Sequence, residues 1–235
     1  MRAMVCRELT GIGSLRLEDA PTPVPTAGQL QLTVRACGVN FADSLITRGQ
    51  YQVQPQPPFS PGFEVAGEVS ALGEGVTGFA IGDRVIAITP HGGYAEQVAV
   101  NVERCVAMPA AMPWAHGAAF PVVFGTSHIA LWHRARLQPG ETLVVHGASG
   151  GVGLTAVAIG KQLGATVIAT ASSPDKLAVA REHGADQLID TSREDVRERI
   201  KTLTGGRGAD AVNSSPPTGS LRSIAFEGRI LVIGF

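Results

Sequence analysis

The glycine-rich segment His146-Gly147-Ala148-Ser149-Gly150-Gly151-Val152-Gly153 constrains the fold of this 235-residue chain more than any other stretch. It follows a short apolar run, Thr142–His146, and precedes a run of helical character, Val152–Leu163. Ala148, Gly150 and Gly153 occupy the three small-residue positions of the pattern G-x-G-x-x-G, which permit a tight turn and close packing of the helix on the strand. The segment therefore predicts a strand, a tight turn and a helix in succession.

The same turn is suited to binding a pyrophosphate. Small side chains let the backbone approach a diphosphate, and the N-terminus of the next helix offers free N–H groups and a partial positive charge. The residues expected to bind a dinucleotide are Ala148, Ser149, Gly150, Gly151, Val152 and Gly153. Taken alone, the motif also fits a glycine-rich turn without a ligand.

The second half of the chain has the alternation of a parallel α/β sheet. Its predicted strands are Thr142–His146, Thr166–Thr170, Gln187–Asp190, Ala209–Asn213 and Arg229–Ile233. Gly164 is expected to end the helix that begins at Val152. Ser173 is expected to cap a second helix, with Pro174 in its first turn and Gly184 after its end. This order predicts a doubly wound sheet over residues 121–235.

The first half has a different pattern. Short runs with alternating apolar residues, separated by Gly and Pro, occur at Gln29–Ala36, Val65–Leu72, Arg84–Thr89 and Ala95–Val100. Alternation of this kind is typical of an all-β barrel or sandwich. We therefore expect a β-domain over residues 1–120, joined to the α/β domain.

The end of the second predicted strand indicates which nicotinamide cofactor would bind. NAD sites usually place Asp or Glu there, to hold the ribose hydroxyls. This strand is followed by Ala171, Ser172 and Ser173, without an acid. Ser173 and Lys176 are placed to bind a 2′-phosphate, so we predict NADPH rather than NADH. Lys176 is also compatible with an ordinary solvated lysine.

Charge and composition exclude several other classes. Nineteen basic and twenty acidic residues give a net charge of −1, which predicts no nucleic-acid or anionic-membrane partner. The stretch Cys105–Trp132 has no charged residue, but its three prolines interrupt the helix that a membrane span needs. We interpret it as a buried segment between the domains. Three scattered cysteines favour a reducing compartment.

Several further motifs occur in a consistent order along the chain: Ala36–Asp43 (ACGVNFAD), Pro61–Gly67 (PGFEVAG), Gly82–Val85 (GDRV) and His91–Glu96 (HGGYAE). With the Ala148–Gly153 turn, they resemble the zinc-less quinone oxidoreductases of the medium-chain dehydrogenase/reductase superfamily, close to the quinone oxidoreductase-like branch. The resemblance implies a GroES-like β-barrel domain followed by a Rossmann domain. It also implies a cytoplasmic, usually homodimeric enzyme that transfers hydride from NADPH to a quinone or another α,β-unsaturated carbonyl.

The resemblance also suggests individual site residues. It assigns Asn40, Asp43 and Tyr51 to the substrate site, as catalytic candidates, and Thr126 to the cofactor. Each has a structural alternative: Asn40 and Asp43 as a helix-start pair that satisfies backbone groups, Tyr51 as surface packing, and Thr126 as a helix cap. Phe63 stands where zinc-dependent relatives carry a histidine ligand, so no metal is expected.

Two further functional hypotheses remain open. One is an enoyl or alkenal reductase of the same superfamily, and the other is a non-catalytic homologue that binds NADPH. The family continues beyond the position of Phe235 through a sixth strand. If Phe235 is the true C-terminus, we expect a truncated chain whose last strand has an open edge, with weak cofactor binding, slow turnover and non-native self-association. The alternative is that these residues are part of a longer chain, which would be an ordinary dimeric enzyme.

Overall fold

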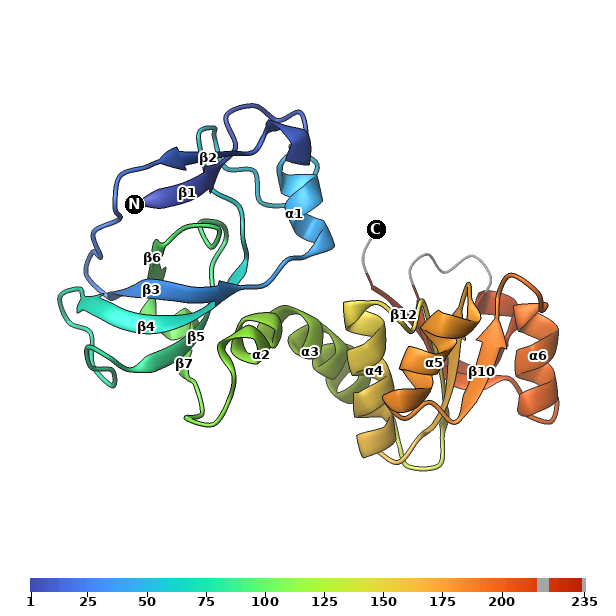
Figure 1. The fold of residues 1–235 in the computed structure, drawn as a ribbon. Coiled ribbons are helices and arrows are strands. Elements are labelled where there is room, and N and C mark those ends of the chain that lie inside the picture. Colours follow the sequence, from blue (N-terminus) through green and yellow to red (C-terminus); the bar gives the residue numbers. More distant parts are fainter. Residues whose placement is uncertain (215–219, 234–235) are drawn as a thin grey trace. The chain divides into compact units, whose positions relative to one another are not determined.

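The computed structural model divides into two units, Met1–Val122 and Val123–Phe235 (Figure 1). Antiparallel strands form the first unit. The structure describes residues 1–214 and 220–233. A five-stranded sheet has the order β6-β3-β4-β5-β7, and β1 pairs with β2. The strands are β1 (Arg2–Val5), β2 (Arg16–Asp19), β3 (Gln29–Cys37), β4 (Glu64–Leu72), β5 (Arg84–Ile88), β6 (Gln97–Asn101) and β7 (Cys105–Ala107).

Alternate residues of these strands make the core of the first unit. Successive side chains of a strand point to opposite faces, so every second residue can be buried. The buried set is Leu30, Leu32, Val65, Val69, Val85, Ala87, Val98, Val100 and Cys105. Complete burial of one such aliphatic side chain contributes about 1.5–3 kcal/mol. The alternation of apolar residues in the sequence therefore predicts which side chains form this core.

Helices α1 (Phe41–Ile46) and α2 (Trp114–Ala119) belong to the first unit. Helix α3 (Pro121–His128) begins at the end of the first unit and runs into the second, where a π-helical segment, Ile129–Arg134, continues it. The interpretation of Cys105–Trp132 as a buried segment is wrong in part. Leu131 is fully buried, but Ile129 and Trp132 are 53% and 56% exposed. A helix on a domain surface buries only one face, so the absence of charge does not imply burial.

The second unit is a parallel sheet with the order β10-β9-β8-β11-β12. Its strands are β8 (Thr142–His146), β9 (Thr166–Ala171), β10 (Gln187–Asp190), β11 (Ala209–Ser214) and β12 (Ile224–Val232). Its helices are α4 (Gly151–Gln162), α5 (Pro174–Glu182) and α6 (Val196–Leu203). The chain order reverses direction at β8, which is where ligands bind in doubly wound folds, beyond the carboxyl ends of the strands.

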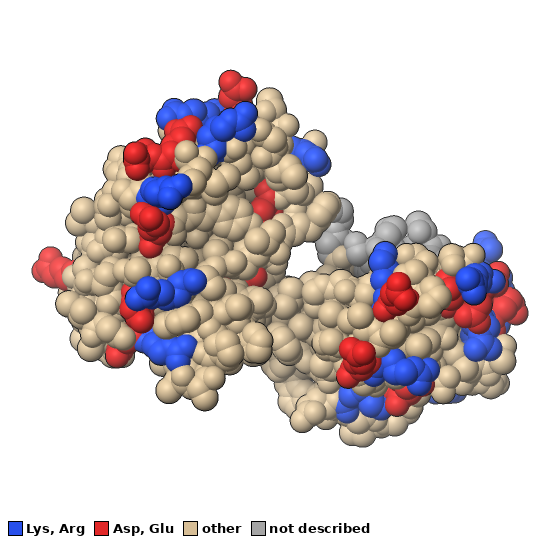
Figure 2. All heavy atoms as spheres, in the orientation of Figure 1, with Lys and Arg blue, Asp and Glu red and all other residues tan. Residues whose placement is uncertain are grey.

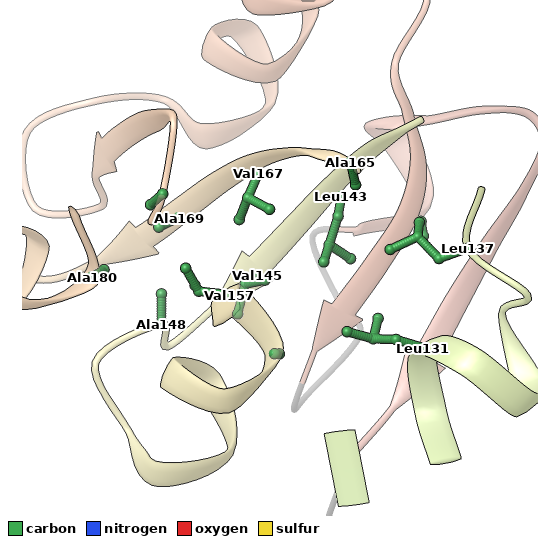
Figure 3. Close-up of a cluster of buried hydrophobic side chains, with 13 residues drawn as sticks. Leu131, Leu137, Leu143, Val145, Ala148, Val157, Ala165, Val167, Ala169 and Ala180 are labelled. Atoms are coloured by element: carbon green, nitrogen blue, oxygen red, sulfur yellow. The ribbon is translucent and has the colours of Figure 1, made fainter. Parts of the chain in front are cut away.

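Both faces of β8 are covered. Leu143 and Val145 pack with Val157 of α4 and Val167 of β9 on one face (Figure 3). Val144 lies in a second cluster, with Ile200 of α6. Strand β8 is therefore apolar without alternation, as expected of a central parallel strand.

Two elements of the second unit differ from the sequence-based prediction. The last strand was expected at Arg229–Ile233, but β12 begins at Ile224. Glu227 in the middle of β12 has a φ of 60°, and the pairing of β12 with β11 shifts register. This irregularity interrupts the regular strand pattern, so the start of β12 could not be predicted from the sequence. Helix α6 was not predicted, because its charged surface obscures the buried Ile200 and half-buried neighbours.

Candidate functional site

The turn between β8 and α4 has the geometry of an anion-binding site. Gly147 has a φ of 61°, and Gly150, the N-cap of α4, has no side chain to bond the first N–H groups of the helix. These N–H groups have no intrahelical partner, so they are available to a ligand. At Gly153 a Cβ would overlap Gly147 O and lie 2.8 Å from Ala148 Cα, so only glycine fits there.

The segment that follows β9 begins beside the glycine-rich turn. Ala148 N–H donates to Thr170 O at 3.0 Å, and His146 Nδ1 lies 3.0 Å from Thr170 Oγ1. The segment after β9 therefore starts at the same edge of the sheet as the glycine-rich turn. Burial lowers the pKa of His146, which favours the neutral imidazole at this edge.

The structure brings Ser173 and Lys176 together and adds Ser172, which the sequence analysis did not select. Ser173 caps α5 by accepting the N–H of Lys176 at 3.5 Å, and Lys176 Nζ donates to Ser172 Oγ at 3.2 Å. The signal for Ser172 was present, because it belongs to the same acid-free segment.

At the end of β10, the Asp190 carboxylate accepts from Ser192 Oγ at 2.6 Å.

Thr126 lies inside α3, so its alternative role as a helix cap is wrong. The neighbouring residue Ser127 donates to Val152 O at 2.9 Å and lies 2.8 Å from Thr155 Oγ1. Thr155 in turn donates to Val123 O at 3.0 Å. These hydroxyls attach α3 to the first turns of α4, near the predicted cofactor turn.

In the first unit, Asn40 and Asp43 form the start of α1. Asn40 is the N-cap, and its N–H donates to Asp43 Oδ2 at 2.7 Å. Asp43 Oδ1 accepts the N–H of Gly62 at 3.0 Å. Burial raises the pKa of Asp43, although both N–H bonds oppose this shift. The contacts of both residues are those of the helix-start alternative, because the Asn40 side chain also accepts from the backbone of Asp43 in a reciprocal capping box. The Asn40 side chain has one further partner.

That partner is Glu64, the first residue of β4 and only 2% exposed. Its Oε1 accepts from Asn40 Nδ2 at 2.8 Å, and its Oε2 accepts the N–H of Val122 at 2.8 Å. Burial raises its pKa, and nearby Asp43 adds to the effect. The sequence analysis missed Glu64 as a site residue, although an acid inside the apolar segment Pro61–Gly67 was a usable signal.

The remaining polar groups near this cluster are held in their neutral forms. Burial raises the pKa of Cys37 to about 12, with smaller contributions from Asp43 and Glu64, so the thiol is protonated at neutral pH. Burial and Asp43 also raise the pKa of Tyr94. Tyr51 is half-buried and packs on Phe63, with ring centroids 5.2 Å apart. Tyr51 thus belongs to an apolar cluster rather than to the hydrogen bonds around Glu64.

The donor set of this region does not fit a zinc ion. Within residues 1–214 and 220–233, no three His, Cys, Asp or Glu side chains are arranged to hold a metal. Phe63 is buried and offers no ligand atom. Zinc sites need three or four such ligands that converge. No reaction step is therefore assigned to a metal.

Comparison with known proteins agrees with this architecture. The family model of the alcohol dehydrogenase GroES-like domain matches residues 26–110, and that of the zinc-binding dehydrogenases matches residues 151–235. Quinone oxidoreductase-like protein 2 of Rattus norvegicus is 38% identical over 239 residues, which cover all of this chain and 68% of that protein.

Two solved structures are closely similar. The quinone oxidoreductase of Thermus thermophilus, solved alone and with NADPH, has a TM-score of 0.87 and 36% identity, covering 99% of this chain and 74% of that one. The CurK enoyl reductase has a TM-score of 0.91 and 33% identity, covering 100% and 74%. The predicted pairing of a GroES-like domain with a Rossmann domain is confirmed.

The fold and the glycine-rich turn define a two-domain oxidoreductase of the medium-chain type. Within that superfamily, the chain belongs to the quinone oxidoreductase family. It spans about two thirds of the length of the curated relatives that it matches. The helices in the described parts of the chain are too short or too polar to cross a bilayer. On the face that Figure 2 shows, acidic and basic side chains are interspersed.

Proposed function

We propose that this chain carries the cofactor and substrate sites of an NADPH-dependent reductase that acts on a quinone or another α,β-unsaturated carbonyl. The main support is the edge of the parallel sheet, where a glycine-rich turn adjoins an acid-free segment with Ser172, Ser173 and Lys176. A hydroxyl pair and an ammonium group are suited to a 2′-phosphate. The NADPH complex of the Thermus thermophilus relative supports the same choice.

Each part of this edge has a separate role. The uncapped N–H groups at the start of α4 would hold the pyrophosphate. Lys176 and the two serines would hold the 2′-phosphate. The bound nicotinamide supplies the hydride, and the protein orients the two reactants and excludes water. The three cysteines are free, which supports a reducing compartment such as the cytoplasm.

The first unit would supply the substrate contacts. The Asn40 amide can hydrogen-bond a ligand, and we retain Asp43 and Tyr51 as candidates for the same site. An electrophilic quinone or enone accepts hydride without a Lewis acid, whereas alcohol oxidation needs one to polarise the hydroxyl. The donor set around Phe63 and Glu64 therefore supports reduction of a conjugated carbonyl.

Lys176→Ala tests the cofactor assignment. A charge-assisted contact to phosphate contributes about 1.5–3 kcal/mol, which corresponds to roughly 10- to 150-fold in affinity. Fluorescence titration should show that loss for NADPH and little change for NADH. Lys201→Ala, on α6, is the matched control and should leave both affinities unchanged. An equal loss for the two cofactors in Lys176→Ala would contradict the assignment.

The similarity to the CurK enoyl reductase supports a second candidate, an enoyl or alkenal reductase. The two candidates share the cofactor site and differ in the acceptor. A scan of acceptors at fixed NADPH separates them: higher kcat/KM for quinones favours the first, and higher kcat/KM for enals or enoyl thioesters favours the second. Binding of NADPH without turnover of any acceptor would instead favour a non-catalytic protein.

A further inference from the structure

The second unit has a pocket at the edge of its sheet that lies opposite the glycine-rich turn. Its volume is about 640 Å³, which is within the range of small-molecule sites. Residues of the π-helical segment, of the loop before β8 and of the end of α4 line it. The chain leaves this pocket to enter β8 and β9 at their amino ends, whereas the glycine-rich turn follows the carboxyl end of β8.

The pocket has cationic and aromatic groups but no acid in its lining, which includes Trp132, His133 and Arg136. Residues 104–140 contain no Asp or Glu. The next acid along the chain, Glu141, accepts from Arg229 Nη2 at 2.7 Å and from the N–H of Gln138 at 2.8 Å, so its charge is already compensated. The local charge of the pocket is therefore positive.

The guanidinium of Arg136 has no partner within the described parts of the chain. None of the ion pairs found there includes it, and it makes no side-chain hydrogen bond. A guanidinium presents a rigid fork of N–H donors that matches a carboxylate. The open valences of Arg136 thus favour an anionic ligand in the pocket.

Arg136 also occupies a backbone position that arginine does not favour. Its φ is 49°, and helices commonly place glycine in this left-handed conformation just after their end. The turn is fixed by other groups: Leu137 N–H donates to Leu131 O at 3.0 Å, and Gln138 Nε2 donates to Arg136 O at 2.7 Å. Leu137 is anchored in the core (Figure 3). The fold therefore requires this turn, but not an arginine side chain in it.

Trp132 gives the pocket an aromatic surface that is already oriented. Its side chain is more than half exposed and stacks on His128, with ring centroids 6.3 Å apart and an interplanar angle of 15°. This stack restrains the indole before a ligand arrives, which lowers the entropic cost of binding. An indole and an unpartnered guanidinium in one pocket are suited to a ligand with an aromatic ring and a negative charge.

We propose that this pocket binds an aromatic carboxylate. Arg136 pairs with the carboxylate, Trp132 packs against the ring, and the apolar residues Leu137, Pro139 and Leu163 enclose the rest of the ligand. The site lies at the opposite edge of the sheet from the proposed cofactor turn. It is therefore a second ligand site, and it does not depend on the proposed reductase function.

The indole N–H signal of Trp132 in a ¹H–¹⁵N spectrum tests the proposal on the full chain. The chain has two tryptophans, so the signal that persists in Trp114→Phe is that of Trp132. Titration with 2-naphthoate should move this signal to saturation. The neutral analogue 2-naphthamide should bind roughly tenfold or more weakly, because it forms no ion pair. No saturable shift with 2-naphthoate, or equal affinity for the two probes, would overturn the proposal.

A matched pair of variants separates Arg136 from general surface charge. Arg136→Gln should weaken 2-naphthoate by roughly tenfold or more. Arg134→Gln removes an exposed cation of the same segment that does not line the pocket, and it should leave the affinity unchanged. An equal loss in both variants would mean that surface charge alone attracts the probe, and the proposed site would be wrong.

Arg136→Gly tests whether the arginine serves the ligand or the fold. Glycine adopts this φ without strain, so the variant should have a thermal midpoint at or above that of the wild type while it loses 2-naphthoate binding. Loss of binding then has no explanation in unfolding. A lower midpoint would show that the arginine side chain stabilises the turn, which would remove the argument for a ligand.

Saturating NADPH distinguishes this pocket from the proposed cofactor site. The affinity for 2-naphthoate should be the same with and without NADPH, because the two sites lie at opposite edges of the sheet. Competition between the two would place the probe in the cofactor site and overturn the proposal. A chain that bound no NADPH would contradict the proposed function, while the titration with 2-naphthoate would still decide the status of the pocket.

Discussion

At the scale of single residues, substitutions at Gly153 and Gly150 of the proposed cofactor turn should distinguish an effect on folding stability from an effect on ligand binding. A Cβ at Gly153 would meet backbone atoms of the turn, so Gly153→Ala should lower the free energy of unfolding by about 1–3 kcal/mol. A Cβ at Gly150 would have its nearest neighbour at 3.5 Å, an ordinary contact. Gly150→Ala should therefore keep the stability and weaken NADPH binding, because its methyl group would lie at the turn that we propose binds the pyrophosphate. Chemical denaturation and fluorescence titration measure the two effects.

The contrast between the two variants gives the control. If Gly150→Ala destabilised the chain as much as Gly153→Ala, position 150 would require glycine because of the packing of the turn and not because a ligand needs the space. If both variants bound NADPH as the wild type does, the assignment of the turn to the cofactor would be wrong.

At the scale of elements, α6 depends on its cap. Asp195 accepts the N–H of Glu198 at 3.0 Å and so satisfies one free donor at the helix start. Asp195→Ala should lower the free energy of unfolding by about 1 kcal/mol, measured by urea denaturation. Glu182→Ala, an exposed acid at the end of α5, should cause no such loss. A smaller effect of Asp195→Ala than of this control would contradict the capping role.

The elements also show what the sequence could predict. Strand β10 has the predicted bounds, and the caps at Ser173 and Gly184 were recognised, because periodicity and capping are local properties. The start of β12 was missed because its irregular pairing depends on β11. In the site, Asn40 and Asp43 were selected, but Glu64 was not. An acid in an apolar segment was a local signal for Glu64, but its hydrogen-bond partners lie 24 and 58 positions away in the chain, so the local pattern could not identify them.

At the scale of the whole molecule, buried acids should make stability depend on pH. The pKa values of Asp43 and Glu64 are raised in the folded state, mainly by burial. Between their ordinary and raised pKa values, the folded chain binds more protons than the unfolded chain, so the free energy of unfolding falls as pH rises. Asp190, whose pKa is lowered by its bonds to Ser192, has the opposite effect: its contribution is lost as pH falls.

A difference measurement isolates the contribution of Glu64. The stability of Glu64→Gln relative to the wild type should increase as pH rises from about 4 to 7, because only the wild type must ionise a buried carboxyl. Thermal unfolding at several pH values provides the data. Glu68→Gln serves as the reference, and a constant difference for Glu64→Gln across this range would contradict the prediction.

The burial of β8 from Thr142 to Val145 affects how a sheet like this one can change in evolution. A strand with no water-facing side tolerates few substitutions, whereas the segment after β9 is largely exposed and outside the core. Mutations at Ser172 or Lys176 can therefore accumulate without a matching change in the interior. If Ser172 and Lys176 set the cofactor preference, as we propose, that preference can change between related proteins while the scaffold stays the same, because the interior is constrained by packing and the exposed segment by ligand binding.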